Sequence, residues 1–234
     1  MIYTDKNRKD VNGSQRETSI CTINESFIDF KGYQNFTIMN DSVVTTCPKI
    51  KNQFNFLKDI DYSNSDTIID VGCSNGFFAF WYLTTYPEKQ ITFMDHDKEC
   101  INNIQRVLKK LDKPNYTIVN QNFNRFIEND IKYDTILMLS IIHWLYSCTT
   151  TICCLNDILK NVRNKNNKQL VIEWVDNDDN AIKSFNHISY NFLEHKSPYN
   201  LETFLKALKS LYNKVELLGY TNREHTRSIY ICTV

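Results

Sequence analysis

Residues 67–76, with the sequence TIIDVGCSNG, constrain the fold of this chain more than any other stretch. The apolar first half ends in Asp70, and Gly72 and Gly76 then open the apolar run 77–83. The residues before the acid are typical of a buried strand, and the run after it is long and apolar enough for a buried helix. Glycine permits the positive φ angles and the close backbone approach that a tight turn requires. The stretch therefore predicts a strand, a tight turn and a helix.

A second acid follows the next predicted strand. Residues 91–94 form that strand, and Asp95 ends it, nineteen residues beyond Gly76. An acid at the carboxyl end of the neighbouring strand is placed to accept hydrogen bonds from a nucleoside ribose. The dinucleotide pattern G-x-G-x-x-G fails here, because Ser74 and Phe77 occupy its second and third glycine positions, and the chain has no P-loop. The glycines therefore indicate neither a dinucleotide site nor a triphosphate site.

The rest of the chain alternates predicted strands with predicted helices, which is typical of an α/β fold. Asp97 and Asn200 are expected to cap two of the helices. We expect a mostly parallel sheet of seven strands that ends in an antiparallel hairpin. The further strands are expected at residues 116–119, 133–139, 169–172, 214–220 and 227–233, and the helices at 51–60, 97–111, 152–162, 179–193 and 200–211.

The pattern D-x-G-x-x-x-G formed by Asp70, Gly72 and Gly76 resembles motif I of class I S-adenosylmethionine (SAM) methyltransferases, with Ser74 where the family usually has a glycine. The resemblance covers roughly residues 50–234. It implies a Rossmann-like fold, SAM as the cofactor and methyl transfer as the reaction. The cofactor-binding residues that it implies are Asp70, Gly72, Cys73, Ser74, Gly76, Asp95, His96, Asn122, Phe123 and Ser140.

Residues 1–50 are predicted to be an extension of a domain formed by residues 51–234. The first twenty residues are polar with few apolar anchors, which indicates a disordered or loosely docked start. Residues 20–44 alternate apolar and polar side chains, which predicts one or two short β elements. In many class I methyltransferases such a segment covers the active site, and an edge hairpin without a catalytic role is the alternative.

Candidates for chemistry at the methyl acceptor lie at the ends of two later strands. His143 follows the strand 133–139, at the edge where ligands bind in open α/β sheets. A hydroxyl acceptor requires a base, and His143 is favoured because the ordinary pKa of histidine lies near operating pH. Glu173 and His195 are the competing candidates. An acid beside an indole suits a sugar ring. The expected substrate contacts are Trp174 and Tyr199.

The segment 172–176, together with residues 194–196 and 227–230, resembles a branch of small stand-alone methyltransferases often associated with modification of sugars or polysaccharides. This resemblance implies O-methylation of a small molecule or of a sugar hydroxyl. An RNA methyltransferase and a non-catalytic SAM-fold binding protein are the alternatives. An RNA enzyme should present a basic face, whereas Lys plus Arg and Asp plus Glu each total 27. The balanced charge favours neither a nucleic acid nor a membrane partner.

The eight cysteines include no C-x-x-C pair and no Cys/His cluster with zinc spacing, so no metal site is predicted. No secretory signal opens the sequence, and no apolar run reaches the length of a membrane span. We therefore expect a cytoplasmic protein with reduced thiols that does not enter a membrane. The sequence gives no indication of the oligomeric state.

Overall fold

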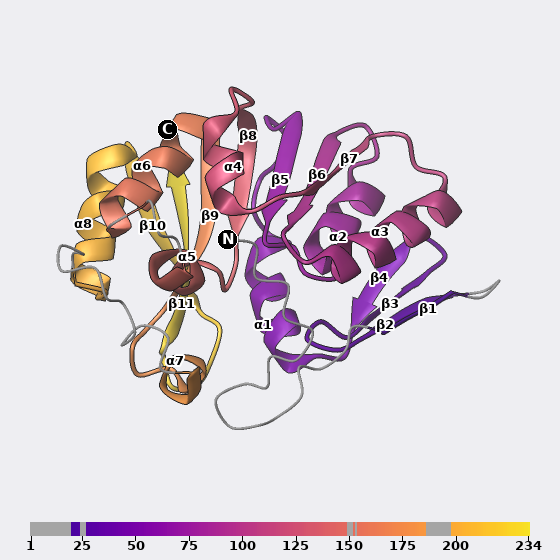
Figure 1. Cartoon of the computed structure of the whole chain (residues 1–234), viewed down its shortest axis with the longest axis horizontal. Helices are drawn as coiled ribbons and strands as arrows, with labels where there is room; N and C mark the ends of the chain where they lie inside the picture. The colour runs from indigo at the N-terminus through magenta and orange to yellow at the C-terminus, as the bar shows by residue number, and fades with distance from the viewer. Residues whose placement is uncertain (1–19, 24–26, 149–151, 153, 186–197) are drawn as a thin grey trace.

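The computed structural model describes residues 20–23, 27–148, 152, 154–185 and 198–234. In this part of the chain, the strands form a central sheet of seven strands and a smaller N-terminal sheet of four strands. Figure 1 shows helices on both sides of the central sheet.

The central sheet has the order β10-β11-β9-β8-β5-β6-β7. The pairings from β9 to β7 are parallel, and β11 pairs antiparallel with both β9 and β10. This confirms the predicted mostly parallel sheet of seven strands with a C-terminal hairpin. The strands are β5 (Thr67–Val71), β6 (Gln90–Asp95), β7 (Tyr116–Asn120), β8 (Tyr133–Met138), β9 (Asn166–Val175), β10 (Lys214–Tyr220) and β11 (Arg227–Thr233).

Helices cover both faces of the sheet, and each face has its own apolar core. Successive residues of a strand point to opposite faces. Ile69 of β5 accordingly packs in the core that includes α6 and α8, and Ile68 packs in the core that includes α2 and α3. The helices are α1 (Pro48–Leu57), α2 (Phe77–Thr85), α3 (Lys98–Leu111), α4 (Phe123–Glu128), α5 (Ile142–Cys148), α6 (Leu155–Lys165), α7 (Asn180–Phe185) and α8 (Leu201–Leu211). Among these helices, none has both the length and the apolar character that crossing a membrane requires.

The two predicted helix caps are confirmed. The Asp97 side chain accepts hydrogen bonds from two N–H groups in the first turn of α3, and the Asn200 side chain accepts one from Thr203 in α8. The predicted helix 51–60 begins earlier, because Pro48 is well suited to the first turn of a helix. Of the helix predicted over residues 179–193, α7 lies within the described residues, and 186–197 lie outside them. The short helices α4 and α5 were not predicted.

The N-terminal sheet has four antiparallel strands, more than the one or two predicted. They are β1 (Ile20–Ile23), β2 (Ile28–Lys31), β3 (Phe36–Met39) and β4 (Ser42–Thr45). Alternate side chains of β2 and β3 are buried, among them Phe30 and Phe36, whose rings stack at 4.4 Å between centroids. Phe36 also meets Phe77 of α2 edge to face at 5.5 Å. The sheet therefore shares the core of α2 and α3.

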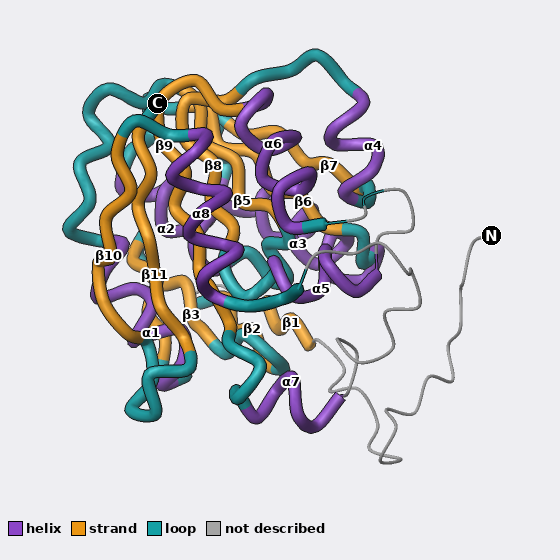
Figure 2. The backbone as a smooth tube through the Cα atoms, turned by 90° about the vertical axis from the view of Figure 1, so that its left-hand side faces the viewer, coloured by secondary structure: helices purple, strands orange, loops and turns teal. Residues whose placement is uncertain are grey.

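Figures 1 and 2 place the N-terminal sheet, α1 and α7 at the same end of the molecule. Because α7 follows β9, this is the end at which the parallel strands finish. Ligands of open α/β sheets bind outside the carboxyl ends of the strands. The N-terminal sheet is thus close to the edge where a functional site is expected.

Candidate functional site

The loop of residues 72–76, here called the glycine loop, joins β5 to α2 at the carboxyl edge of the sheet. Gly72, Ser74 and Gly76 all have positive φ angles, of 75°, 53° and 85°. Ser74 thus adopts the left-handed conformation that the glycine usual at this position would adopt without strain. A Cβ atom added to Gly72 would lie 2.2 Å from Cδ1 of Ile141, so a larger residue would displace that side chain and would be strained at this φ angle.

Asp95 lies at the end of β6 and contacts the glycine loop directly. Its Oδ2 accepts a hydrogen bond from the N–H of Ser74 at 2.8 Å, and its Oδ1 accepts one from the N–H of Asp97 at 2.9 Å. The Nδ1 atom of His96 lies 3.2 Å from the same Oδ1. Only 7% of Asp95 is exposed. The structure therefore brings together the glycine loop, Asp95 and His96, which were predicted to hold the cofactor.

These hydrogen bonds keep Asp95 ionised. Burial alone would raise the pKa of the carboxyl, but the hydrogen bonds from His96, Asp97 and Ser74 outweigh burial and hold the pKa below its ordinary value. A carboxylate has about four lone-pair sites, and three are used here. Asp95 is therefore left able to accept a hydrogen bond from a ligand.

Asp70, at the start of the predicted motif, is 3% exposed. Its Oδ2 has no hydrogen-bond partner among the described residues. Burial, with a smaller contribution from the charge of Asp95, raises the pKa of Asp70 to about 7. A buried carboxyl oxygen without a partner is costly, and it is suited to accept a proton or to pair with a cation. Cys73 is also buried, and its burial raises the pKa of the thiol well above the ordinary value.

The loop after β7 lies beside Asp95. The Nδ2 group of Asn120 donates to the backbone oxygen of Asp95 at 3.0 Å, and the N–H of Gln121 donates to the same oxygen at 3.1 Å. Asn122 is exposed, and its side chain accepts a hydrogen bond from the N–H of Arg125 as the cap of α4. Phe123 is buried. The predicted pair of Asn122 and Phe123 therefore lies next to the acid, with the Asn122 side-chain oxygen used as a helix cap.

Ser140 and Glu173 meet at the ends of β8 and β9. Glu173 is fully buried, and its Oε2 accepts hydrogen bonds from the Ser140 hydroxyl and, at 2.8 Å, from Nε2 of Gln53. Its Oε1 accepts a hydrogen bond from the Thr221 hydroxyl at 2.7 Å. Ser140 has a φ angle of 54°, a strained conformation that only firm surroundings maintain. The network fixes Ser140 in position.

Arg227 of β11 completes this network. Its Nη1 donates to the Ser140 hydroxyl at 3.3 Å and lies 4.0 Å from Oε2 of Glu173. Its Nε and Nη2 donate to the two carboxylate oxygens of Asp179, both at 2.8 Å. Burial alone would raise the pKa of Asp179, but the hydrogen bonds from Arg227 and from the N–H of Ala181 outweigh it, so the pKa lies below its ordinary value. The buried cation is therefore balanced by two acids.

Of the two histidines predicted as candidate bases, the structure describes only one. His143 is buried on α5, three residues after Ser140. His195 lies outside the described residues.

Trp174 and Tyr199, the predicted substrate contacts, are both buried in the structure. Trp174 is 1% exposed, and its ring stacks between Tyr199 at 4.4 Å and Phe204 at 4.8 Å between centroids. The buried hydroxyl of Tyr199 donates to the backbone oxygen of Val175 at 2.7 Å. Glu173 and Trp174 are neighbours in β9 and therefore point to opposite faces of the sheet. Only Glu173 faces the network around Ser140.

Sequence reasoning missed the residues that the N-terminal segment brings to this edge. The backbone oxygen of Gln34 accepts a hydrogen bond from Nδ2 of Asn75 at 3.4 Å, and its side-chain oxygen accepts one from the N–H of Phe77 at 3.2 Å. Gln53 of α1 reaches Ser140 and Glu173. In the sequence, Gln53 is one polar residue among several in a predicted helix. A single glutamine there does not indicate that it will be buried or which residue it will contact.

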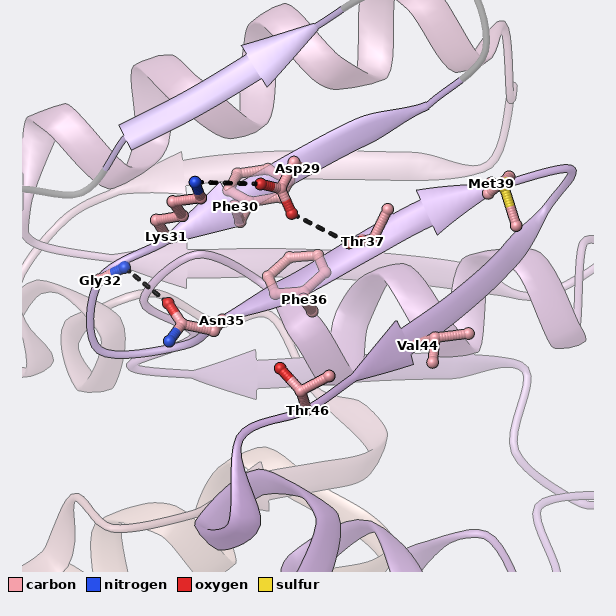
Figure 3. Close-up of a pocket in the computed structure, with 10 residues that line it drawn as sticks. All are labelled: Asp29, Phe30, Lys31, Gly32, Asn35, Phe36, Thr37, Met39, Val44 and Thr46. Carbon is pink, nitrogen blue, oxygen red and sulfur yellow. Dashed lines mark hydrogen bonds and ion pairs between the residues drawn. The ribbon is translucent and has the colours of Figure 1, made fainter.

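A hollow of about 710 Å³ lies on the N-terminal sheet (Figure 3). Asp29 accepts a hydrogen bond from Thr37 at 2.9 Å, and the N–H of Gly32 donates to Asn35 at 2.8 Å. The hollow is lined by Asp29, Phe30, Lys31, Gly32, Asn35, Phe36, Thr37, Met39, Val44 and Thr46. One end of it therefore reaches the β2–β3 turn, which also contacts the glycine loop.

Residues 68–162 match a family model described as a methyltransferase domain. A search of curated protein sequences found no significant match. The matched segment begins in β5 and includes the glycine loop, Asp95 and Ser140.

Solved structures of similar fold cover most of this chain. They include the bifunctional kinase-methyltransferase WbdD, with a TM-score of 0.56 and 14% identity over 79% of this chain and 38% of that chain. Magnesium protoporphyrin IX methyltransferase from Synechocystis PCC 6803, crystallised with SAH, has a TM-score of 0.54 and 12% identity over 79% of this chain and 82% of its own. An O-methyltransferase family protein from Burkholderia thailandensis has a TM-score of 0.56 and 11% identity, over 78% and 55% of the two chains. This chain thus spans little more than a third of the WbdD chain.

Residues 68–162 match a methyltransferase domain, and the chain shares the fold of class I SAM-dependent methyltransferases. Both findings bear out the resemblance to SAM-dependent methyltransferases and the cofactor that it implies. The residues present suit SAM, which carries a positive charge on its sulfur, an ammonium group and ribose hydroxyls. Asp70 has a buried carboxyl oxygen without a partner among the described residues, and Asp95 can accept a further hydrogen bond.

Proposed function

We propose that this protein methylates a hydroxyl group of a small molecule or of a sugar. The observation that carries the proposal is the meeting of the glycine loop, Asp95 and the Ser140 network at one edge of the sheet. The loop and the acid suit the cofactor. The polar residues after β8 and β9 suit an acceptor that forms hydrogen bonds. The names of two structural neighbours, an O-methyltransferase family protein and the kinase-methyltransferase WbdD, are in accord with it.

SAM supplies, when bound, a methyl carbon that is activated by its sulfonium. In this proposal the protein holds the donor through Asp70, the glycine loop and Asp95. Fixing donor and acceptor in line is worth about 7 to 11 kcal/mol of the barrier. Ser140 is well placed for this role, because its hydroxyl and its strained backbone are held by Glu173, Gln53 and Arg227.

We assign removal of the acceptor proton to His143. Histidine can accept a proton near neutral pH, and His143 lies in the first turn of α5, five residues after β8 ends at Met138. Glu173 is less suited to be the base, because both its oxygens already accept hydrogen bonds. We assign to Glu173 the positioning of Ser140. His195 remains a candidate from sequence alone.

Incubation with radiolabelled SAM tests the function across several classes of acceptor at once. Small metabolites, glycans, nucleotides and RNA from the source are separated and offered to the full chain. We expect the label in the small-molecule or glycan fraction, bound through an oxygen atom. Label found in RNA, with binding that weakens as salt is added, would instead support the alternative of an RNA methyltransferase.

A further inference from the structure

Tyr33 and Lys49 form a polar pair that the proposed function does not use. The Lys49 Nζ group hydrogen-bonds the Tyr33 hydroxyl and lies 4.4 Å from the centroid of its ring. Half of Tyr33 is exposed, and Lys49 is partly exposed. Tyr33 lies in the β2–β3 turn, and Lys49 lies in the first turn of α1. Both polar groups are therefore accessible to a ligand.

The pair lies beside the candidate active site. Gln34, the residue after Tyr33, bonds Asn75 in the glycine loop and the first N–H of α2. Tyr33 also lies in the neighbourhood of Arg227. Arg227 in turn bonds Ser140. The pair is thus located between the cofactor loop and the Ser140 network.

Arg227 and Lys49 both lie near this edge of the sheet, but they differ in whether a carboxylate neutralises their charge. Arg227 forms ion pairs with Asp179 and Glu173. Lys49 forms no ion pair with a carboxylate of the described residues, and its described polar partner is the neutral Tyr33 hydroxyl. An ammonium without a carboxylate partner, beside a hydroxyl donor, can form charge-assisted hydrogen bonds to an anion.

We propose that Tyr33 and Lys49 form a subsite that binds an anionic group of the methyl acceptor, such as the carboxylate of an acidic sugar or the phosphate of a sugar phosphate. This inference rests on the proposed function and specifies its substrate class. The hollow on the N-terminal sheet has one end at Gly32 and Asn35, on either side of this part of the turn (Figure 3). It gives room for the remainder of an acceptor longer than one ring.

The test compares three sugars that share a ring and differ in charge, namely glucose, glucuronate and glucose 6-phosphate. Their binding to the full chain is measured by NMR titration, without SAM and with SAM. At low salt, we expect one or both charged sugars to bind about tenfold more tightly than glucose, the size expected for a charge-assisted hydrogen bond. Whether glucuronate or the phosphate binds more tightly identifies the anion. Added salt should reduce the preference.

The variants Lys49→Met and Lys49→Glu should abolish this preference, and Tyr33→Phe should reduce it. Lys110→Met is the control, because it removes an exposed lysine from the last turn of α3. It should leave the preference for charged sugars unchanged. Thermal unfolding and SAM affinity show that each variant is folded. Equal binding of the three sugars by the wild-type chain, or an unchanged preference in Lys49→Met, would overturn the subsite. Failure of the wild-type chain to bind SAM would count against the proposed function instead.

Discussion

At the scale of single residues, Asp95 is the acid on which cofactor binding is expected to depend. Replacing it by alanine removes a charged acceptor and releases the N–H of Ser74. We expect Asp95→Ala to weaken SAM binding by about 1.5 to 3 kcal/mol, or roughly ten- to a hundredfold. Calorimetry measures the affinity for SAM, and Asp130→Ala, at an exposed position, is the control. An unchanged affinity in a folded Asp95→Ala chain would refute the assignment.

Asp70 gives a prediction about pH. Its pKa of about 7 in the folded chain is above the ordinary value of about 4. Between these values the folded chain keeps a proton that the unfolded chain has lost, so the contribution of Asp70 to stability falls as pH rises through that range. The free energy of unfolding of Asp70→Asn, relative to wild type, should therefore rise by up to about 4 kcal/mol from pH 4 to pH 7.

Urea unfolding of both chains at pH 4, 5, 6 and 7 measures this difference. Taking the difference between the chains cancels the acids that Asp70→Asn leaves unchanged, such as Asp179, whose lowered pKa has the opposite effect on stability. A difference that is the same at every pH would show that Asp70 is ionised throughout.

His143 gives a prediction about catalysis. If it removes the acceptor proton, His143→Ala should lower turnover by about 10²- to 10⁴-fold and leave SAM affinity unchanged. His225→Ala is the matched control, because the exposed ring of His225 stacks on Tyr220. Wild-type turnover in His143→Ala would remove it from the mechanism, and His195→Ala would then be the next variant to measure.

At the scale of elements, α1 is joined to the central sheet through Gln53. Its side chain donates to both Ser140 and Glu173, and its loss leaves a buried carboxylate with one donor fewer. We expect Gln53→Ala to lower the free energy of unfolding by about 1 to 3 kcal/mol. It should also lower turnover, because Ser140 loses a support. Gln105→Ala, on the exposed face of α3, should change neither.

Urea unfolding and initial rates measure the two effects of Gln53→Ala separately. Restoring the hydrogen bond with Gln53→Glu is not expected to work, because it would place a second carboxylate beside Glu173. Stability and turnover both at wild-type level in Gln53→Ala would show that the bonds from α1 are dispensable.

At the scale of the whole molecule, the N-terminal sheet and the central domain share one core. Phe36 packs on Phe30 and on Phe77 of α2. Phe36→Ala should therefore lower the stability of the entire chain by about 3 to 5 kcal/mol. Met39→Ala, at an exposed position of the same strand, should have little effect. A single unfolding transition that shifts as a whole is expected, and two separate transitions would show that the sheet unfolds independently.

Local patterns in the sequence were sufficient to predict most of the fold. The apolar run before Asp70, the two glycines and the caps Asp97 and Asn200 are each read from a few adjacent residues, and each is found where the pattern predicts. The alternation of strands and helices then allows few topologies, because parallel neighbours require crossover connections. The cofactor came from the resemblance of the D-x-G-x-x-x-G pattern to motif I of class I methyltransferases, whereas the glycine spacing by itself argued only against dinucleotide and triphosphate sites.

Contacts between residues that are far apart in the sequence could not be predicted from such local patterns. Gln53 and Glu173 are 120 residues apart, and nothing near either one in sequence marks the other as its partner. The acid beside Trp174 in the sequence favours a substrate platform, yet packing against Tyr199 and Phe204 buries both faces of the Trp174 ring. Hydrophobic periodicity and backbone sterics act over a few residues and so are visible in the sequence, whereas the surroundings of a side chain depend on how whole elements pack.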